Sequence, residues 1–148
     1  MYPWLLLLTN QKYRNSNPDS ISQGYPRPIR KGFDGIPNDL DAAFVWSGND
    51  KIYFFKGSNY WKFDPEARPP VEEGYPRPVA NWEGVPDHVD DALQYENGYT
   101  YFFKQGKYYR FDDMRFKVDK GDPPFPRSAG QWWFGCESEN NESWQLMD

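Results

Sequence analysis

YFFKGSNYWKF (residues 53–63) and YFFKQGKYYRF (residues 101–111) are two closely similar stretches, separated by a constant offset of 48 positions. Each consists of two aromatic-rich runs that flank a short turn, Gly57-Ser58 in the first copy and Gln105-Gly106 in the second. Aromatic residues favour strands, and glycine supplies the positive φ that a tight hairpin needs. The two stretches therefore predict two copies of an antiparallel hairpin.

The residues before each hairpin repeat as well. DAAF (41–44) precedes the first hairpin and DDAL (90–93) precedes the second. Turns rich in glycine and asparagine, at 47–50 and 96–98, follow these segments, so a further strand is predicted ahead of each hairpin. The predicted strands are residues 43–46, 51–56 and 60–63 in the first copy and residues 92–95, 100–104 and 108–111 in the second.

A proline-rich element occurs three times, as GYPRP (24–28), GYPRP (74–78) and a looser FPRS (125–128). Because proline cannot donate to a strand ladder, this element is predicted to be an outer edge strand or a loop. A repeat of about 50 residues is typical of β-propeller blades and kelch-like arrays. An aromatic residue and a glycine follow each copy: Phe33 and Gly35, Trp82 and Gly84, and Trp133 and Gly135.

The start of the chain fits the same repeat. WLLLL (4–8) aligns with IYFFK (52–56) at the offset of 48 positions, so residues 3–15 are predicted to be the middle of a truncated blade. A signal peptide is less favoured, because the stretch has no basic n-region and no small-residue cleavage site. The predicted organisation is a blade remnant at 1–35, blades at 36–84 and 85–136, and a polar tail at 137–148.

Composition agrees with an all-β domain and excludes several functions. Aromatic residues make up 20% of the 148 residues, and the 14 prolines and 12 glycines disfavour long helices. The net charge of −5 suits nucleic acid poorly, and no stretch approaches the ~20 apolar residues of a membrane span. The local basic cluster of Arg27, Arg30 and Lys31 is interpreted as a solvated loop.

Catalysis is not predicted for this chain. A zinc protease site of the HExxH type needs two histidines and a further ligand, whereas His88 is the only histidine. A Ser-His-Asp triad would also have to use His88, and no GxSxG motif accompanies it. Heme iron is usually held by His, Cys, Met or Tyr, and a single histidine without an evident pocket disfavours a heme carrier.

Two features bear on the compartment of the protein. Asn141 begins an N-glycosylation sequon, NES, which gives weak support to secretion. Cys136 is the only cysteine, and it cannot close a disulfide within this chain. The prediction of an extracellular location, secreted or at the cell surface, depends on the family that the repeats resemble rather than on these two features.

The motifs DLDAAF (39–44), YFFKGSNYWKF (53–63), GYPRP (74–78) and WWFGC (132–136) together resemble the hemopexin-like repeats of matrix metalloproteinases. The resemblance covers roughly residues 3–136. It implies a partial four-bladed β-propeller with antiparallel blades, in which this chain holds about two and a half blades at the C-terminal end. In such domains a disulfide bond joins a cysteine at the end of the last blade to one at the start of the first blade. Cys136 matches the cysteine of the last blade, and the matching cysteine of the first blade is absent from this chain.

The resemblance also implies a structural calcium ion in the propeller channel. Asp41, Ala43, Asp90 and Ala92 lie at the matching positions and would contribute largely main-chain oxygens, which suit a hard cation. The alternative is that Asp41 and Asp90 cap strand starts or bond neighbouring loop amides. Zinc would belong only to a catalytic domain absent from this chain.

The function implied is that of a non-catalytic recognition domain of an extracellular zinc metalloendopeptidase. Its partners would be extracellular matrix proteins, protease inhibitors or a second protease copy, and not nucleic acid. The alternative is a vitronectin- or hemopexin-like adhesion or carrier protein.

The side chains of the repeated strands carry two further expectations. The aromatic residues are expected to form core between blades rather than a sugar-binding platform. The basic residues of the same strands are expected to be ordinary solvent-facing side chains: Lys56, Lys62, Lys104 and Arg110.

Overall fold

In the residues that the structure describes, the chain forms three antiparallel sheets, which we call blades A, B and C. The computed structural model describes residues 5–8, 12–17, 20–21, 24, 26–95 and 97–137, with only the backbone of those up to 21. Blade A contains β1 (Leu5–Leu8), β2 (Lys12–Asn17), β3 (Ser20–Ile21) and β4 (Arg27–Pro28).

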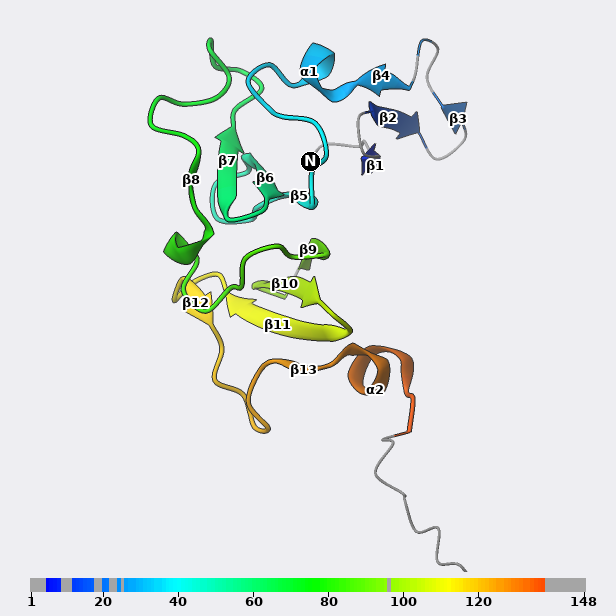
Figure 1. Cartoon of the computed structure of the whole chain (residues 1–148), viewed down its shortest axis with the longest axis vertical. Coiled ribbons are helices and arrows are strands. Elements are labelled where there is room, and N and C mark those ends of the chain that lie inside the picture. Colours follow the sequence, from blue (N-terminus) through cyan, green and yellow to red (C-terminus); the bar gives the residue numbers. More distant parts are fainter. Residues whose placement is uncertain are drawn as a thin grey trace, which may run out of the picture.

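Blades B and C follow in sequence and contain the two repeated hairpins (Figure 1). Each predicted strand is confirmed to within one residue at either end, because glycine- and asparagine-rich turns delimit the aromatic runs. Blade B contains β5 (Ala42–Val45), β6 (Ile52–Lys56), β7 (Asn59–Phe63) and β8 (Arg77–Pro78). Blade C contains β9 (Asp91–Tyr95), β10 (Tyr99–Lys104), β11 (Lys107–Asp112), β12 (Lys117–Val118) and β13 (Arg127–Ser128).

The proline-rich element forms the short outer strand of every blade. β4, β8 and β13 each pair antiparallel with the long strand that precedes them. The register is the same in all three blades, and in each case a tyrosine of the long strand faces an arginine of the short one. These pairs are Tyr13 with Arg27, Tyr60 with Arg77, and Tyr108 with Arg127.

A short helical segment follows each outer strand, a feature that the sequence did not predict. The segments are α1 (Ile29–Gly32), the 3-10 helix η1 (Val79–Asn81) and α2 (Ala129–Phe134). They are too short to show a helical period in the sequence. The first residue of each segment is buried, so each helix fixes the chain as it leaves the blade.

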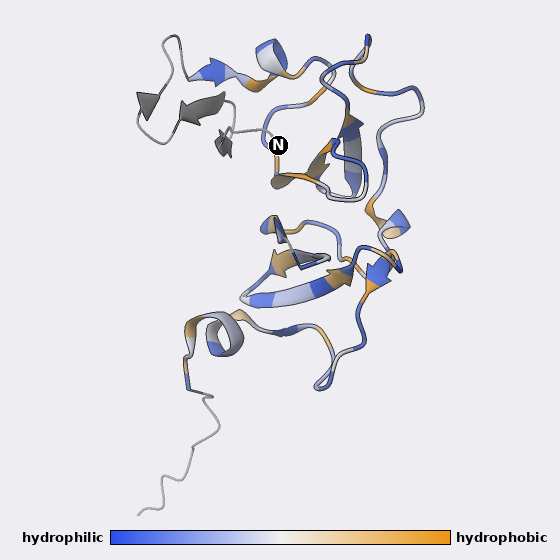
Figure 2. Ribbon diagram, turned by 180° about the vertical axis from the view of Figure 1, so that it is seen from behind, coloured by the Kyte–Doolittle hydropathy of each residue, from blue (hydrophilic) through white to orange (hydrophobic). Residues whose placement is uncertain are grey.

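The core between blades B and C combines aromatic side chains with smaller aliphatic ones. Trp82, which follows η1, is fully buried at its centre. Tyr53 and Phe55 of β6 pack on it from blade B, and Phe102 and Phe111 pack on it from blade C. Figure 2 shows hydrophobic and hydrophilic residues mixed along the strands of blades B and C.

A second core lies between α1 and blade B. Phe33 packs edge-on against Phe54 and Phe63, with Ile29 and Ile36 buried beside them. Because side chains alternate along a strand, β6 sends Phe54 to this core and its neighbouring residues to the other. The aromatic residues of blade B are therefore core, as expected: Tyr53, Phe54, Phe55, Tyr60 and Phe63 are buried, and Trp61 is partly buried.

Candidate functional site

The inner edge of the blades is formed by β5 and β9, which are the terminal strands of their sheets and lie next to one another (Figure 1). A strand at the edge of a sheet leaves half of its backbone N–H and C=O groups unpaired. Two such strands side by side place main-chain oxygens from two blades along one common edge.

Asp41 and Asp90 occupy equivalent positions just before these strands. The backbone N–H of each donates to the carbonyl of the strand beside it, Phe55 or Phe103, over 2.8 Å. The carboxylate of Asp41 accepts the N–H of Gly57 at 2.7 Å, and that of Asp90 accepts the N–H of Gln105 at 2.7 Å. The two side chains therefore bond loop amides and hold the hairpin turns.

The side chains of Ala43 and Ala92 pack in the cores between blades. Within the described ranges, no group of three or more His, Cys, Asp or Glu side chains is placed to hold a metal ion. The alanine side chains offer no ligand, so Ala43 and Ala92 could bind a cation only through main-chain oxygens. Such oxygens suit calcium chemically.

The basic residues of the strands are not simple solvent-facing side chains, and that expectation was wrong. Lys56 donates to the carbonyl of Asn38 at 2.7 Å, and Lys104 donates to the carbonyl of Asp87. Each lysine thereby links the loop that precedes the inner strand, β5 or β9, to the end of the neighbouring strand, β6 or β10. The other two form ion pairs: Lys62 with Glu72 and Arg110 with Asp119.

The ion pairs shift the pKa values of their carboxylates. Lys62, through its hydrogen bond, holds the pKa of Glu72 below its usual value, and Glu72 in turn raises the pKa of Lys62. The Arg110 guanidinium likewise holds the pKa of the Asp119 carboxyl below its usual value.

The variant Asp119→Asn tests the second ion pair. A carboxylate whose folded pKa is lowered stabilises the fold fully above its unfolded pKa of about 4, and this contribution is lost as pH falls through the folded pKa. We expect Asp119→Asn to cost about 1 kcal/mol at neutral pH and progressively less in acid. Urea unfolding at pH 7 and pH 3 measures this, with the exposed Asp122→Asn as control. A cost that does not change with pH would contradict it.

Sequence reasoning missed a polar junction between blades B and C. The carboxylate of Asp113 accepts Trp46 Nε1 at 3.0 Å from blade B and, within blade C, Thr100 Oγ1 at 2.7 Å and Gln94 Nε2 at 2.9 Å. Thr100 is fully buried. These partners lie far apart in the sequence, so no local motif marks them.

Among the described residues, no segment covers the apolar outer face of blade C. Trp133 packs on Tyr101, Phe103 and Tyr108, just as Trp82 packs on the matching rings of blade B. Trp82 is covered on its other side by blade C, whereas Trp133 remains 39% exposed. Exposed apolar surface of this kind is typical of an interaction surface.

His88 and Cys136, two residues singled out in the sequence, lie apart. His88 is an exposed loop residue whose backbone N–H donates to the carbonyl of Gly57. Cys136 is exposed just after α2, and it is free. Asn141 lies outside the described residues. None of the helices in the described part of the chain is long and apolar enough to cross a membrane.

The model of the Hemopexin family matches residues 40–87 and 89–136, more than half of the chain. The chain belongs to the hemopexin family. The first matched range contains the strands of blade B, and the second contains the strands of blade C.

Among curated relatives, this hemopexin-family chain is 32% identical to matrix metalloproteinase-2 of Drosophila melanogaster, over 93% of the chain and 18% of that protein. It is 40% identical to stromelysin-3 of Xenopus laevis, over 68% of the chain and 21% of that protein. Human vitronectin is 22% identical, with 88% of the chain and 53% of vitronectin covered. The chain thus spans about a fifth of the length of these two metalloproteinases.

Solved structures share the fold. A plant albumin from Cicer arietinum matches with a TM-score of 0.71 at 19% identity, over 90% of this chain and 66% of the albumin. A hemopexin fold protein from cow pea matches with a TM-score of 0.60 at 18% identity, over 74% of this chain and 56% of that protein. The expected fold class, a partial β-propeller of antiparallel blades, is confirmed.

Proposed function

We propose that this chain is a non-catalytic recognition domain of an extracellular zinc metalloendopeptidase, secreted or at the cell surface. The observation that carries the proposal is the identity of 32% and 40% to two metalloproteinases. The uncovered apolar face of blade C around Trp133 supplies a surface for partners. Zinc chemistry would then reside in a catalytic domain outside this chain.

The partners proposed are extracellular matrix proteins, protease inhibitors or a second protease copy. Interstitial collagenase of Equus caballus is 37% identical over 60% of this chain, which makes collagen a reasonable first probe. We expect the chain to bind immobilised fibrillar collagen saturably in biolayer interferometry. Trp133→Ala should weaken that binding and leave the fold intact. Failure to bind collagen, a protease inhibitor or a second copy would contradict the proposal.

A vitronectin-like adhesion protein is the second candidate function. Vitronectin of Oryctolagus cuniculus is 23% identical, and the match covers 92% of this chain and 54% of vitronectin. The full-length coding sequence separates the two candidates. An HExxH zinc motif ahead of these blades supports the metalloendopeptidase, and its absence from the complete coding sequence supports the adhesion protein.

We also propose that the carbonyl oxygens of Asp41, Ala43, Asp90 and Ala92 contribute to a structural calcium site. Support comes from the adjacent inner edges of β5 and β9. Calcium takes roughly six to eight oxygens, and these residues supply ligands from two blades only. We therefore expect weak calcium binding by this chain and tighter binding by a complete four-blade domain. Calorimetric titration of both measures this, and equal affinities would show that the ion binds elsewhere.

Cys136 offers a further test. Because its side chain is exposed and free, we expect iodoacetamide to modify it under native conditions. Mass spectrometry of the labelled chain measures the extent of modification. Resistance to labelling, without a disulfide-linked dimer in the mass spectrum, would contradict the expectation. In a complete domain with the matching cysteine, we expect a disulfide and no labelling.

A further inference from the structure

Blades B and C contain the same ion pair on their outer part. Lys62 of β7 pairs with Glu72, and Arg110 of β11 pairs with Asp119. In both blades the acidic residue directly follows a valine that pairs with the last phenylalanine of the long strand. Val71 pairs with Phe63 in blade B, and Val118 pairs with Phe111 in blade C. The two pairs are therefore equivalent, and differences around them can be compared directly.

In blade C the cation lies against two aromatic rings. The Arg110 guanidinium is 4.7 Å from the centre of the Tyr99 ring and 5.0 Å from that of Phe125. A cation over an aromatic face is attracted by the ring quadrupole.

In blade B a ring is present at only one of the two positions. Lys62 is 5.7 Å from the centre of the Tyr75 ring, which corresponds to Phe125. The position of Tyr99 is taken by Lys51, at the repeat offset of 48. The Lys51 ammonium pairs with Asp64 at 2.8 Å, on the neighbouring strand end. Within the described part of blade B, no ring takes the place that Tyr99 has in blade C.

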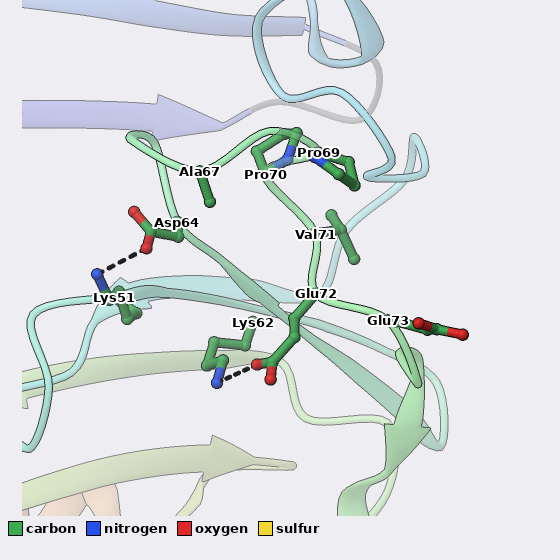
Figure 3. Close-up of a pocket in the computed structure, with 9 residues that line it drawn as sticks. All are labelled: Lys51, Lys62, Asp64, Ala67, Pro69, Pro70, Val71, Glu72 and Glu73. Atoms are coloured by element: carbon green, nitrogen blue, oxygen red, sulfur yellow. Dashed lines mark hydrogen bonds and ion pairs between the residues drawn. The ribbon is translucent and has the colours of Figure 1, made fainter.

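A pocket of about 400 Å³ lies beside Lys51 and Lys62 (Figure 3). Lys51 and Lys62 lie on its strand side with their partners Asp64 and Glu72, and the loop of residues 65–73 arches over them. Beside the equivalent ion pair of blade C, a smaller pocket of about 190 Å³ is lined by Asp112, Arg115, Lys117, Asp119 and Lys120, and by neither Tyr99 nor Arg110. The wall contributed by the loop is largely apolar: Ala67, Pro69, Pro70 and Val71.

We propose that this pocket binds a tyrosine side chain presented by a partner protein. The ring would lie near Lys62, in the place that Tyr99 takes beside Arg110, and against the prolines of the loop. The phenolic hydroxyl can hydrogen-bond with the Lys51–Asp64 pair, which lies at the same pocket. The inference rests on the proposed recognition function, because it names the chemistry of one subsite for such a partner.

The first experiment titrates the ¹⁵N-labelled chain with N-acetyl-tyrosinamide and follows amide chemical shifts. We expect saturable shifts confined to residues around the pocket, such as Lys51, Lys62 and Val71. N-acetyl-leucinamide should bind about two- to fivefold more weakly, since it lacks the ring quadrupole. Diffuse, unsaturable shifts, or equal affinity for both probes, would overturn the proposal.

A matched pair of variants tests the location. Lys51→Tyr places the residue of blade C in the pocket, and we expect it to weaken tyrosinamide binding at least tenfold. Lys51→Met removes the same charge but adds no ring, so binding should remain within a few-fold of that of the unmodified chain. Amide spectra establish that both variants fold. Unchanged tyrosinamide binding by Lys51→Tyr would overturn the proposal, as would equal losses in the two variants.

If Lys51→Tyr does not fold, Lys62→Met tests the cation instead and should weaken binding about two- to fivefold.

Collagen binding by the same variants separates this inference from the proposed function. Loss of both tyrosinamide and collagen binding in Lys51→Tyr supports the inference. Collagen binding that persists in Lys51→Tyr would overturn the claim that this partner presents the ring. Tyrosinamide binding without binding to any matrix protein, inhibitor or second copy would contradict the proposed function and leave the pocket assigned. Collagen binding without tyrosinamide binding would support the proposed function and overturn the assignment of the pocket.

Discussion

Replacing Trp82 by alanine is expected to lower the free energy of unfolding by about 4 kcal/mol. Replacement of a buried tryptophan by alanine typically costs about 3 to 5 kcal/mol. Trp82 is fully buried, and rings from both blade B and blade C pack on it. The cavity would open where the two blades meet, so their packing would suffer along with the local core. Urea unfolding followed by tryptophan fluorescence and far-UV circular dichroism measures the loss.

Trp133→Ala is the matched control, because Trp133 follows the outer strand of blade C as Trp82 follows that of blade B. It packs on three rings of blade C but is 39% exposed. We expect it to cost about 1 to 2 kcal/mol, since part of its surface is already in water. Equal losses for the two tryptophans would show that the contact between blades B and C adds nothing to the stability of this core.

The positions that repeat between blades B and C were sufficient to predict the blades themselves. The aromatic runs around Gly57 and Gly106 determined the strands, because a hairpin needs the same turn chemistry wherever it occurs. Alternation along β6 also predicted that its rings would be core. The short helices η1 and α2 could not be predicted, since they span 3 and 6 residues and show no helical period.

The positions that differ between the repeats were interpreted poorly from sequence, and they carry the specific features of the structure. Lys51 stands at the position of Tyr99, and it lines the pocket of blade B. Asp113 stands where blade B has Pro65, so the repeat gave no reason to expect a polar junction there. Its bond to Trp46 spans 67 positions, and a single sequence contains no signal for such a pair.

Asp113 joins the two complete blades by hydrogen bonds, and its carboxylate oxygens have different partners. Oδ1 accepts Trp46 Nε1 from blade B and the hydroxyl of Thr100, which is fully buried. Oδ2 accepts Gln94 Nε2 and the hydroxyl of Ser47. Removing the carboxylate would leave the Trp46 Nε1–H without its acceptor in the space between the blades, whereas the Thr100 hydroxyl would keep Gln94 Oε1 at 2.9 Å.

We therefore expect Asp113→Ala to cost about 2 kcal/mol, because a buried donor left unpaired costs about 1 to 3 kcal/mol. Asp113→Asn should cost only about 1 kcal/mol, since its amide oxygen can still accept from Trp46 and Thr100 and its NH2 group can donate to Ser47. Urea unfolding of both variants measures the difference, and Asp87→Ala, which removes an exposed carboxylate, is the control. If Asp113→Ala proved no more costly than Asp87→Ala, aromatic packing around Trp82 alone would hold blades B and C together. A ranking of alanine above asparagine above the control would instead show that the carboxylate stabilises the contact between the blades through the donors it accepts.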